Sequence, residues 1–243
     1  MSVISSETRV RHPKRSKRKI TCWAGTQKEE IMDELSRMRQ EYEAGTLDER
    51  LMAADPLETF TEWMYDAIAF GMKEPNAMTV ATASPEGKPS ARVVLLKEVT
   101  ADGFVFFTNY LSRKGMELFT NPFAAVVFDW HDMARQVRVE GRAEKLPAEA
   151  SDAYFNERPE NAKIGAWTSP QSKIVKDRAE IEHLQWEMAQ RFAGKKVERP
   201  SHWGGFLIRP TVMEFWQGRP DRLHDRVVYY KTEEGWSKHR LAP

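Results

Sequence analysis

The feature that most constrains the fold of this chain is a series of short β-type runs that begins near residue 77. Turn signals, such as Asp102 followed by Gly103, separate the runs. They lie at 77–84, 90–97, 104–109, 124–130, 135–146, 204–210, 212–216 and 226–231. Many short strands with few helical crossovers favour an antiparallel barrel over a parallel doubly wound sheet. We therefore predict a mainly β fold of the α+β class, with helices at its periphery.

Helical signals lie before and between these runs. Asp55 and Pro56 are typical of a helix start, and Gly71 is typical of a helix end. The apolar stripe between them, which we assign to the core, consists of Leu57, Phe60, Trp63, Met64, Ala67 and Ile68. A capping box at Thr26 and Glu29 predicts an earlier amphipathic helix that ends at Gly45. Shorter helices are predicted near 113–120, 147–157 and 177–193.

Composition indicates a globular protein. Eight tryptophans and a hydrophobic content of 41% provide for a substantial core, and we predict one domain over residues 26–243. Cys22 is the only cysteine, which excludes an intrachain disulfide and a CxxC metal site. We predict no metal ligands. No apolar run approaches the roughly 18 residues of a spanning helix, and no signal-peptide core follows the start. A soluble protein of the reducing cytoplasm is expected.

The first 20 residues differ in charge from the remaining chain. They contain seven Lys or Arg residues against Glu7, a net charge of +6 that leaves −5 for the remaining chain. A segment of like charge with few apolar residues has little to bury, so residues 1–25 are predicted to be a disordered basic arm. Contact with nucleic acid or acidic lipid, or an organellar address, are the alternatives. Because the rest of the chain is acidic, no nucleic-acid partner is expected.

A candidate phosphate site lies at residues 112–114. Ser112, Arg113 and Lys114 follow a predicted strand and open a short helix. Two cations in a first helical turn oppose the helix dipole unless an anion binds there. An N-cap serine, free backbone N–H groups and two cations together would hold a phosphate. The alternative is that both side chains point to water. No glycine-rich Rossmann or P-loop fingerprint is present, so a nucleotide would need such a site.

A second cationic group lies near the C-terminus. If the strand at VVYY starts as early as Arg222, the two-residue period places Arg222, His224 and Arg226 on one face. Three potential cations on a half-buried face favour an anionic ligand, because unpaired buried charge is costly. A solvated face, with the arginines paired to Asp221 and Asp225, is the alternative.

Several longer segments support a family assignment. They are RVVLLK at 92–97, FFTNYLSRKG at 106–115, RQVRVEG at 135–141, YFNERP at 154–159, IGAWTSPQS at 164–172, WGGF at 203–206, EFWQGRPDRLHDR at 214–226 and the closing RLAP. In this order they resemble the pyridoxine (pyridoxamine) 5′-phosphate oxidases, the FMN enzymes that make pyridoxal phosphate. The resemblance covers roughly residues 30 to 243. It implies the antiparallel FMN-binding split β-barrel and a homodimer with flavin sites at the subunit interface.

The same resemblance implies a set of cofactor residues. Arg113 and Lys114 match the positions that hold the FMN phosphate. The other flavin-contacting positions are Arg92, Val93, Val94, Leu95, Phe107, Thr108, Gln136, Gln171, Ser172, Trp216 and Arg226. In a regular strand Arg92 and Lys97 would face opposite sides, so one strand could serve both cofactor and substrate.

Substrate residues are implied in the same way. Lys97, Tyr154 and Arg158 match positions that hold the substrate phosphate, the last two on one face of a helix that Pro159 ends. A fourth position, serine in the family, is Ala162 here, and Asn161 or Lys163 could compensate. Arg39 and Tyr42 match a helical segment that folds over the substrate. Arg222, Leu223 and His224 match the residues beside its pyridine ring; Arg222 would clamp the substrate, and His224 would hydrogen bond or handle the proton. Which of these two takes the proton is left open.

The predicted function follows from this resemblance. It is FMN-dependent oxidation of pyridoxine 5′-phosphate and pyridoxamine 5′-phosphate to pyridoxal 5′-phosphate, with O2 as acceptor and hydrogen peroxide as product. The alternative is a non-catalytic split-barrel protein that binds flavin or pyridoxal phosphate, for which Ala162 is the only hint.

Overall fold

A computed structural model describes residues 33–35, 38, 42 and 45–243 of the chain. By its internal contacts the chain divides into residues 1–40 and 41–243. Of the first unit, residues 33–35 are helical. The predicted basic arm, Arg39 and most of the first predicted helix lie outside the described residues. Tyr42 belongs to no helix, so that helix does not extend as far as Gly45.

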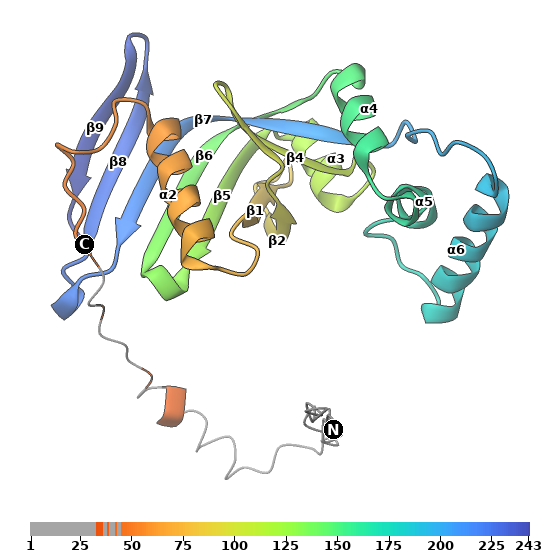
Figure 1. The fold of residues 1–243 in the computed structure, drawn as a ribbon, viewed down its shortest axis with the longest axis horizontal. Coiled ribbons are helices and arrows are strands. Elements are labelled where there is room, and N and C mark those ends of the chain that lie inside the picture. The colour runs from red at the N-terminus through yellow and green to blue at the C-terminus, as the bar shows by residue number, and fades with distance from the viewer. Residues whose placement is uncertain (1–32, 36–37, 39–41, 43–44) are drawn as a thin grey trace, which may run out of the picture. The chain divides into compact units, whose positions relative to one another are not determined.

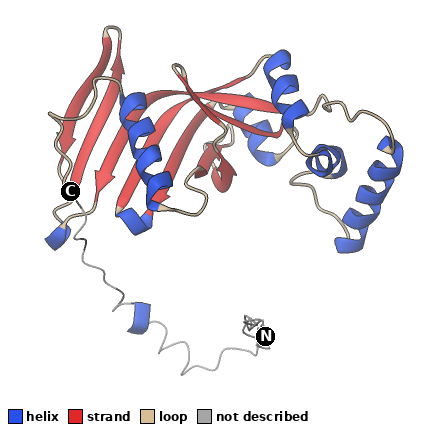
Figure 2. Cartoon of the chain, in the orientation of Figure 1, coloured by secondary structure: helices blue, strands red, loops and turns tan. Residues whose placement is uncertain are grey.

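The second unit is mainly β, as predicted (Figure 2). Its helices are α2 (Pro56–Phe70), α3 (Arg113–Thr120), α4 (Ala148–Glu157), α5 (Glu160–Thr168) and α6 (Arg178–Phe192), with short 3-10 segments at His131–Met133 and Pro220–Arg222. Its strands are β1 (Ala77–Ala83), β2 (Pro89–Leu95), β3 (Glu98–Thr100), β4 (Gly103–Asn109), β5 (Phe123–Trp130), β6 (Arg135–Lys145), β7 (Trp203–Gln217), β8 (Asp225–Thr232) and β9 (Gly235–Leu241). No helix in the described part of the chain is long and apolar enough to cross a membrane.

The strands form one antiparallel sheet in the order β2-β1-β5-β6-β7-β4-β3, with β8 pairing β7 and β9. Strand β7 pairs with β6 along one edge and with β4 and then β8 along the other. Figure 1 shows the β8–β9 hairpin at one end of this sheet and helices α4 to α6 at the other.

The prediction of separate strands at 204–210 and 212–216 was wrong. Both belong to β7, because Pro210, which looks like a strand breaker in sequence, lies opposite Gly141 at a register shift in β6. A bulge of this kind tolerates a proline that a regular central strand would not. Strands β3 and β9 and helix α5 were not predicted, since β3 is only three residues long and β9, GWSKHRL, has few apolar residues.

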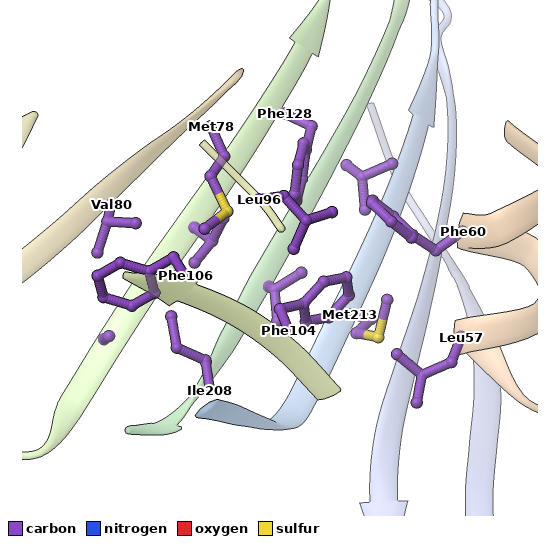
Figure 3. Close-up of a cluster of buried hydrophobic side chains, with 14 of the residues drawn as sticks. Leu57, Phe60, Met78, Val80, Leu96, Phe104, Phe106, Phe128, Ile208 and Met213 are labelled. Atoms are coloured by element: carbon purple, nitrogen blue, oxygen red, sulfur yellow. The ribbon is translucent and has the colours of Figure 1, made fainter. Parts of the chain in front are cut away.

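Helix α2 forms where the sequence predicts it. Asp55 caps it by accepting a hydrogen bond from the Leu57 N–H, and Gly71 ends it in the left-handed conformation at φ 84°. The helix covers one face of the sheet (Figure 1). Phe60 is fully buried, and its ring lies 4.8 Å from the rings of both Phe104 and Phe128 (Figure 3). The stripe does define the core, except for Ile68, which is 56% exposed.

Phe60→Ala should lower the free energy of unfolding by about 3–5 kcal/mol, because the surrounding rings come from different elements and cannot close the cavity. The matched control on the same helix is Ile68→Ala, which should change it by less than about 0.5 kcal/mol. Equilibrium urea denaturation at one protein concentration measures both. Similar losses in the two variants would contradict this account of the core.

Candidate active site

A pocket of about 610 Å³ lies between the strands β2 and β4 and the helices α4 and α5. Ten of the predicted site residues line it: Val93, Val94, Leu95, Lys97, Phe107, Thr108, Lys114, Tyr154, Arg158 and Gln171. We call it the first pocket. Ala162 lines it as well. The structure therefore brings ten of the 21 predicted cofactor and substrate residues into one cavity.

Lys114 is the buried cation of this pocket. Ser112 caps α3 as predicted, its hydroxyl accepting a hydrogen bond from the Gly115 N–H. The Lys114 ammonium donates to the hydroxyl of Thr108 at 3.1 Å and to the side-chain carbonyl of Gln171 at 3.2 Å. Burial, together with the nearby positive charge of Arg92, lowers its pKa to about 8. The predicted alternative, in which this side chain points to water, is excluded because Lys114 is 7% exposed.

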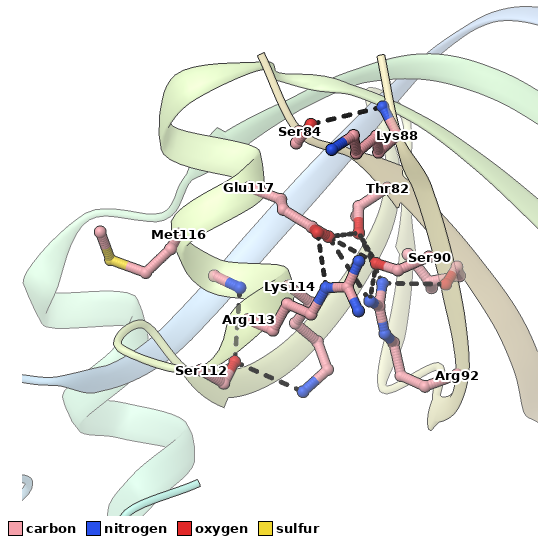
Figure 4. Close-up of polar contacts among 12 residues, drawn as sticks. Thr82, Ser84, Lys88, Ser90, Arg92, Ser112, Arg113, Lys114, Met116 and Glu117 are labelled. Carbon is pink, nitrogen blue, oxygen red and sulfur yellow. Dashed lines mark hydrogen bonds and ion pairs between the residues drawn. The ribbon is translucent and has the colours of Figure 1, made fainter. Parts of the chain in front are cut away.

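Arg92 and Arg113 do not line the first pocket but converge beside it on Glu117 (Figure 4). The Arg113 Nε donates to Glu117 at 2.8 Å, and an Arg92 nitrogen lies 3.5 Å from the same carboxylate. Burial lowers the pKa of Arg92. Burial alone would raise the pKa of Glu117, but hydrogen bonds from Ser90, Thr82 and Arg113 lower it to about 2.

The opposite wall of the first pocket is aromatic. The rings of Phe107 and Tyr154 stack with centroids 3.9 Å apart, and Trp203 stacks on Phe107 at 5.4 Å. The Arg158 guanidinium lies over the Trp203 ring at 4.5 Å, and burial lowers its pKa. One buried nitrogen of Arg158, Nη1, has no hydrogen-bond partner among the described residues.

Two details of this wall differ from prediction. Helix α4 ends at Glu157, and Arg158 follows it in an extended conformation with ψ 147°. The prediction that Tyr154 and Arg158 share one helix face was therefore wrong. Strand β2 ends at Leu95, so the opposite-face argument for Arg92 and Lys97 does not apply. Arg158 and Lys97 still line the first pocket, because the chain turns beside each of them. The turn lies at Pro159 for Arg158 and before β3 for Lys97.

The candidates to replace the missing serine do not line the cavity. The Lys163 ammonium donates to the Asn156 carbonyl at 2.7 Å, and Asn161 is exposed. Ala162 itself faces the first pocket. The pocket wall therefore has a methyl group at this position.

A second pocket, of about 500 Å³, contains three further predicted flavin residues. Gln136 on β6, Trp216 on β7 and Arg226 on β8 are directly opposite one another in register, which places them in one row across the sheet. The Arg226 Nε donates to Glu214 at 2.8 Å, and this bond raises the pKa of Arg226. Tyr42 lines the same pocket.

The expected row of Arg222, His224 and Arg226 on one strand face was wrong. Strand β8 begins only at Asp225, because the chain turns at Pro220–Arg222, where Asp221 and Arg222 adopt the left-handed conformation with φ 55° and 60°. His224 instead packs on Trp216, with ring centroids 4.7 Å apart, and on Tyr42, at 5.6 Å.

The remaining predicted residues lie at the margins. Arg222 and Leu223 are exposed on the turn before β8, and Ser172 is exposed beside Gln171 with φ 69°. Sequence reasoning missed Glu117 and Glu214, the two buried carboxylates that bind predicted flavin arginines. The spacing of Arg113 and Glu117, four residues apart on a predicted helix, was the available signal for the first. Within the described residues no group of three or more His, Cys, Asp or Glu is placed to hold a metal ion.

Comparisons with known proteins agree with these features. The family described as pyridoxamine 5′-phosphate oxidase matches residues 64–183, and the pyridoxine 5′-phosphate oxidase C-terminal dimerisation region matches residues 203–243. A pyridoxine/pyridoxamine 5′-phosphate oxidase of Microcystis aeruginosa is 51% identical over 207 residues, covering 85% of this chain and 97% of its own. The protein of the same name from Salinibacter ruber is 50% identical over 215 residues, covering 87% and 100%.

Solved structures show the same fold. PhzG from Burkholderia lata, crystallised with tetrahydrophenazine-1-carboxylic acid, superposes with a TM-score of 0.78 at 26% identity, covering 84% of this chain and 100% of its own. A pyridoxamine 5′-phosphate oxidase-related, FMN binding protein from Nostoc punctiforme has a TM-score of 0.63 at 17% identity and covers 79% and 100%. The predicted family resemblance and the antiparallel split-barrel fold are confirmed.

Proposed function

Because the chain belongs to the pyridoxine/pyridoxamine 5′-phosphate oxidase family, we propose that it oxidises pyridoxine 5′-phosphate and pyridoxamine 5′-phosphate to pyridoxal 5′-phosphate with FMN as cofactor. O2 is the proposed final acceptor and hydrogen peroxide the second product. The observation that carries the proposal is the buried Nη1 of Arg158, a residue of the first pocket, which has no hydrogen-bond partner among the described residues. A buried polar nitrogen without a hydrogen-bond partner is costly unless a ligand supplies one.

The first pocket suits two phosphate groups. Near the start of α3, Lys114, with Arg113 and Arg92 beside it, would hold the phosphate of FMN. At the α4–α5 corner, Lys97, Tyr154 and Arg158 would hold the phosphate of the substrate. The side-chain amide of Gln171 both donates and accepts, which suits the polar edge of a flavin ring. Bound FMN supplies the acceptor for the hydride that leaves C4′ of the substrate.

We infer a homodimer in which each flavin site is made by two chains. Strand β7 contributes Trp203 to the first pocket and Trp216 to the second. Thirteen residues of strand at about 3.3 Å each separate them by about 40 Å along β7. A mononucleotide is far shorter, so Gln136, Trp216 and Arg226 would contact the flavin held by a second copy. The match of residues 203–243 to a dimerisation region supports this arrangement.

His224 and Arg222 are the proposed residues beside the substrate ring. The Nδ1 atom of His224 accepts a hydrogen bond from the Arg219 N–H at 3.1 Å, so the neutral ring carries its proton on Nε2. His224 would then offer a donor to the 4′ oxygen or nitrogen of the substrate. Arg222, which is exposed on the adjacent turn, would clamp the substrate by its charge.

The decisive experiment separates an oxidase from a flavin carrier. Purified protein should release one FMN per chain on denaturation. Adding pyridoxine 5′-phosphate without oxygen should bleach the flavin absorbance, and admitting oxygen should restore it while pyridoxal phosphate and peroxide form in equal amounts. Bound flavin that never bleaches would identify a carrier, and release of riboflavin or FAD would contradict the FMN assignment.

The pKa of Lys114 predicts how FMN affinity depends on pH. The ammonium form that attracts phosphate prevails below pH 8 and is lost above it. FMN affinity of the flavin-free protein should therefore fall above pH 8, by at most about tenfold per pH unit. Fluorescence titration with FMN measures this effect, with riboflavin as the control that lacks a phosphate. Lys114→Arg, which stays charged, should remove the dependence; its persistence in that variant would contradict the assignment to Lys114.

Ala162→Ser should tighten substrate binding. A new hydroxyl donor to the substrate phosphate would contribute roughly 1–2 kcal/mol, or about tenfold in KM. The phosphate is remote from the reacting atoms, so kcat should not change. Steady-state kinetics with pyridoxine 5′-phosphate tests both statements, and Asn161→Ser, on the exposed side of the same helix, is the matched control. An unchanged KM for the Ala162 variant would contradict the substrate-phosphate assignment of this wall.

A further inference from the structure

Glu117 is a buried acid within a group of cations that, by the function proposed above, binds a phosphate. It is 7% exposed, whereas the Arg113 side chain that it binds is 60% exposed. A carboxylate repels phosphate, so an acid at such a place calls for a physical reason. Its hydrogen bonds give one.

Two hydroxyl groups connect Glu117 to Arg92. The Ser90 hydroxyl donates to Glu117 at 2.6 Å and accepts from one terminal nitrogen of Arg92, while Thr82 donates to Glu117 and accepts from the other nitrogen at 2.6 Å. Each hydroxyl has one proton to donate and lone pairs that accept. Both hydroxyl groups therefore accept from the Arg92 guanidinium and donate to the Glu117 carboxylate. Figure 4 shows the two arginines turned toward Glu117 from different elements.

The charges also balance. Arg92, Arg113 and Lys114 carry three positive charges, and Glu117 reduces the net charge of the four residues to +2. A phosphate monoester carries about −1.5 to −2 at neutral pH. Without the carboxylate, two guanidinium groups on β2 and α3 would repel each other, and the exposed Arg113 side chain would lose the bond that orients it.

We propose that Glu117 is a positioning residue that holds Arg92 and Arg113 in the geometry that binds the FMN phosphate. It holds Arg113 by a direct bond, and Arg92 through Ser90 and Thr82 together with an ion pair at 3.5 Å. This inference rests on the proposed FMN site. It predicts that Glu117 acts on the phosphate end of the cofactor alone.

The test compares FMN with riboflavin, which has the same ring and lacks the phosphate. Flavin-free full-length protein is titrated with each, and the ratio of the two dissociation constants is the readout. Glu117→Gln should weaken FMN binding about tenfold, since it removes a charge-assisted bond, and should leave riboflavin binding within about twofold. Glu117→Asp keeps the charge but shortens the reach to Arg113, and should also weaken FMN selectively. The control is Glu144→Gln, which breaks an exposed bridge to Arg209 and should change neither constant.

The outcomes separate positioning from other roles. Equal weakening of FMN and riboflavin would show a merely structural role, and tighter FMN binding in Glu117→Gln would show only a repelling charge; either overturns the inference. A wild-type chain that binds both ligands equally would instead overturn the proposed phosphate site. If the Glu117 variants do not fold, Ser90→Ala removes one connecting hydroxyl and should weaken FMN alone, by about threefold.

Discussion

The pairing of β7 along both of its edges is the constraint on which the rest of the structure depends. Its N-terminal half is bonded to β4 and its C-terminal half to β8, while β6 pairs with the other edge from Phe206 to Gln217. A strand paired on both sides cannot slip by one residue without turning every side chain to the other face. Both pockets contain residues of β7, so their relative positions within one chain are set by the hydrogen bonds of the sheet.

The charged residues beside the first pocket and those in the second pocket follow a common scheme. A buried glutamate binds two arginines from other turns or strands in each case: Glu117 binds Arg92 and Arg113, and Glu214 binds Arg226 and Arg138. Paired in this way, a guanidinium is held in place before any ligand arrives, and preorganised donors bind more tightly because less ordering remains to be done. The aromatic stack of the first pocket positions the Arg158 guanidinium without a carboxylate, and one nitrogen of that group has no hydrogen-bond partner among the described residues.

Local patterns predicted much of the fold. The Asp55 cap, the stop at Gly71 and the N-cap at Ser112 are short-range signals, and each is confirmed. The errors have long-range causes: Pro210 is tolerated because a bulge lies opposite it on another strand, and the delayed start of β8 follows from left-handed residues after Pro220. The periodicity of the sequence indicates neither the bulge opposite Pro210 nor the left-handed residues after Pro220.

Predictions about the site also succeeded for residues in local motifs and failed for contacts between distant parts of the chain. Motif resemblance identified Lys114 and Arg158, and the structure places both in one cavity. It did not indicate that Arg92 would be bonded through two hydroxyls to Glu117, since those residues come from β1, β2 and α3 and meet only after the sheet has formed. Partners of a functional residue that are distant in sequence need the fold before they can be identified.

The lowered pKa values of Lys114 and Arg158 reflect the free-energy cost of burying two positive charges in the first pocket. Burial disfavours the charged forms of both side chains, so the ligand-free fold carries an electrostatic cost at neutral pH. An anion beside either cation removes part of that cost, and a ligand that binds only the folded chain stabilises it by mass action. The same burial that disfavours the charged form of each side chain strengthens each charge–charge contact in the pocket, because the local dielectric is low. Affinity for anionic ligands and the stability of the fold are therefore coupled through the same two side chains.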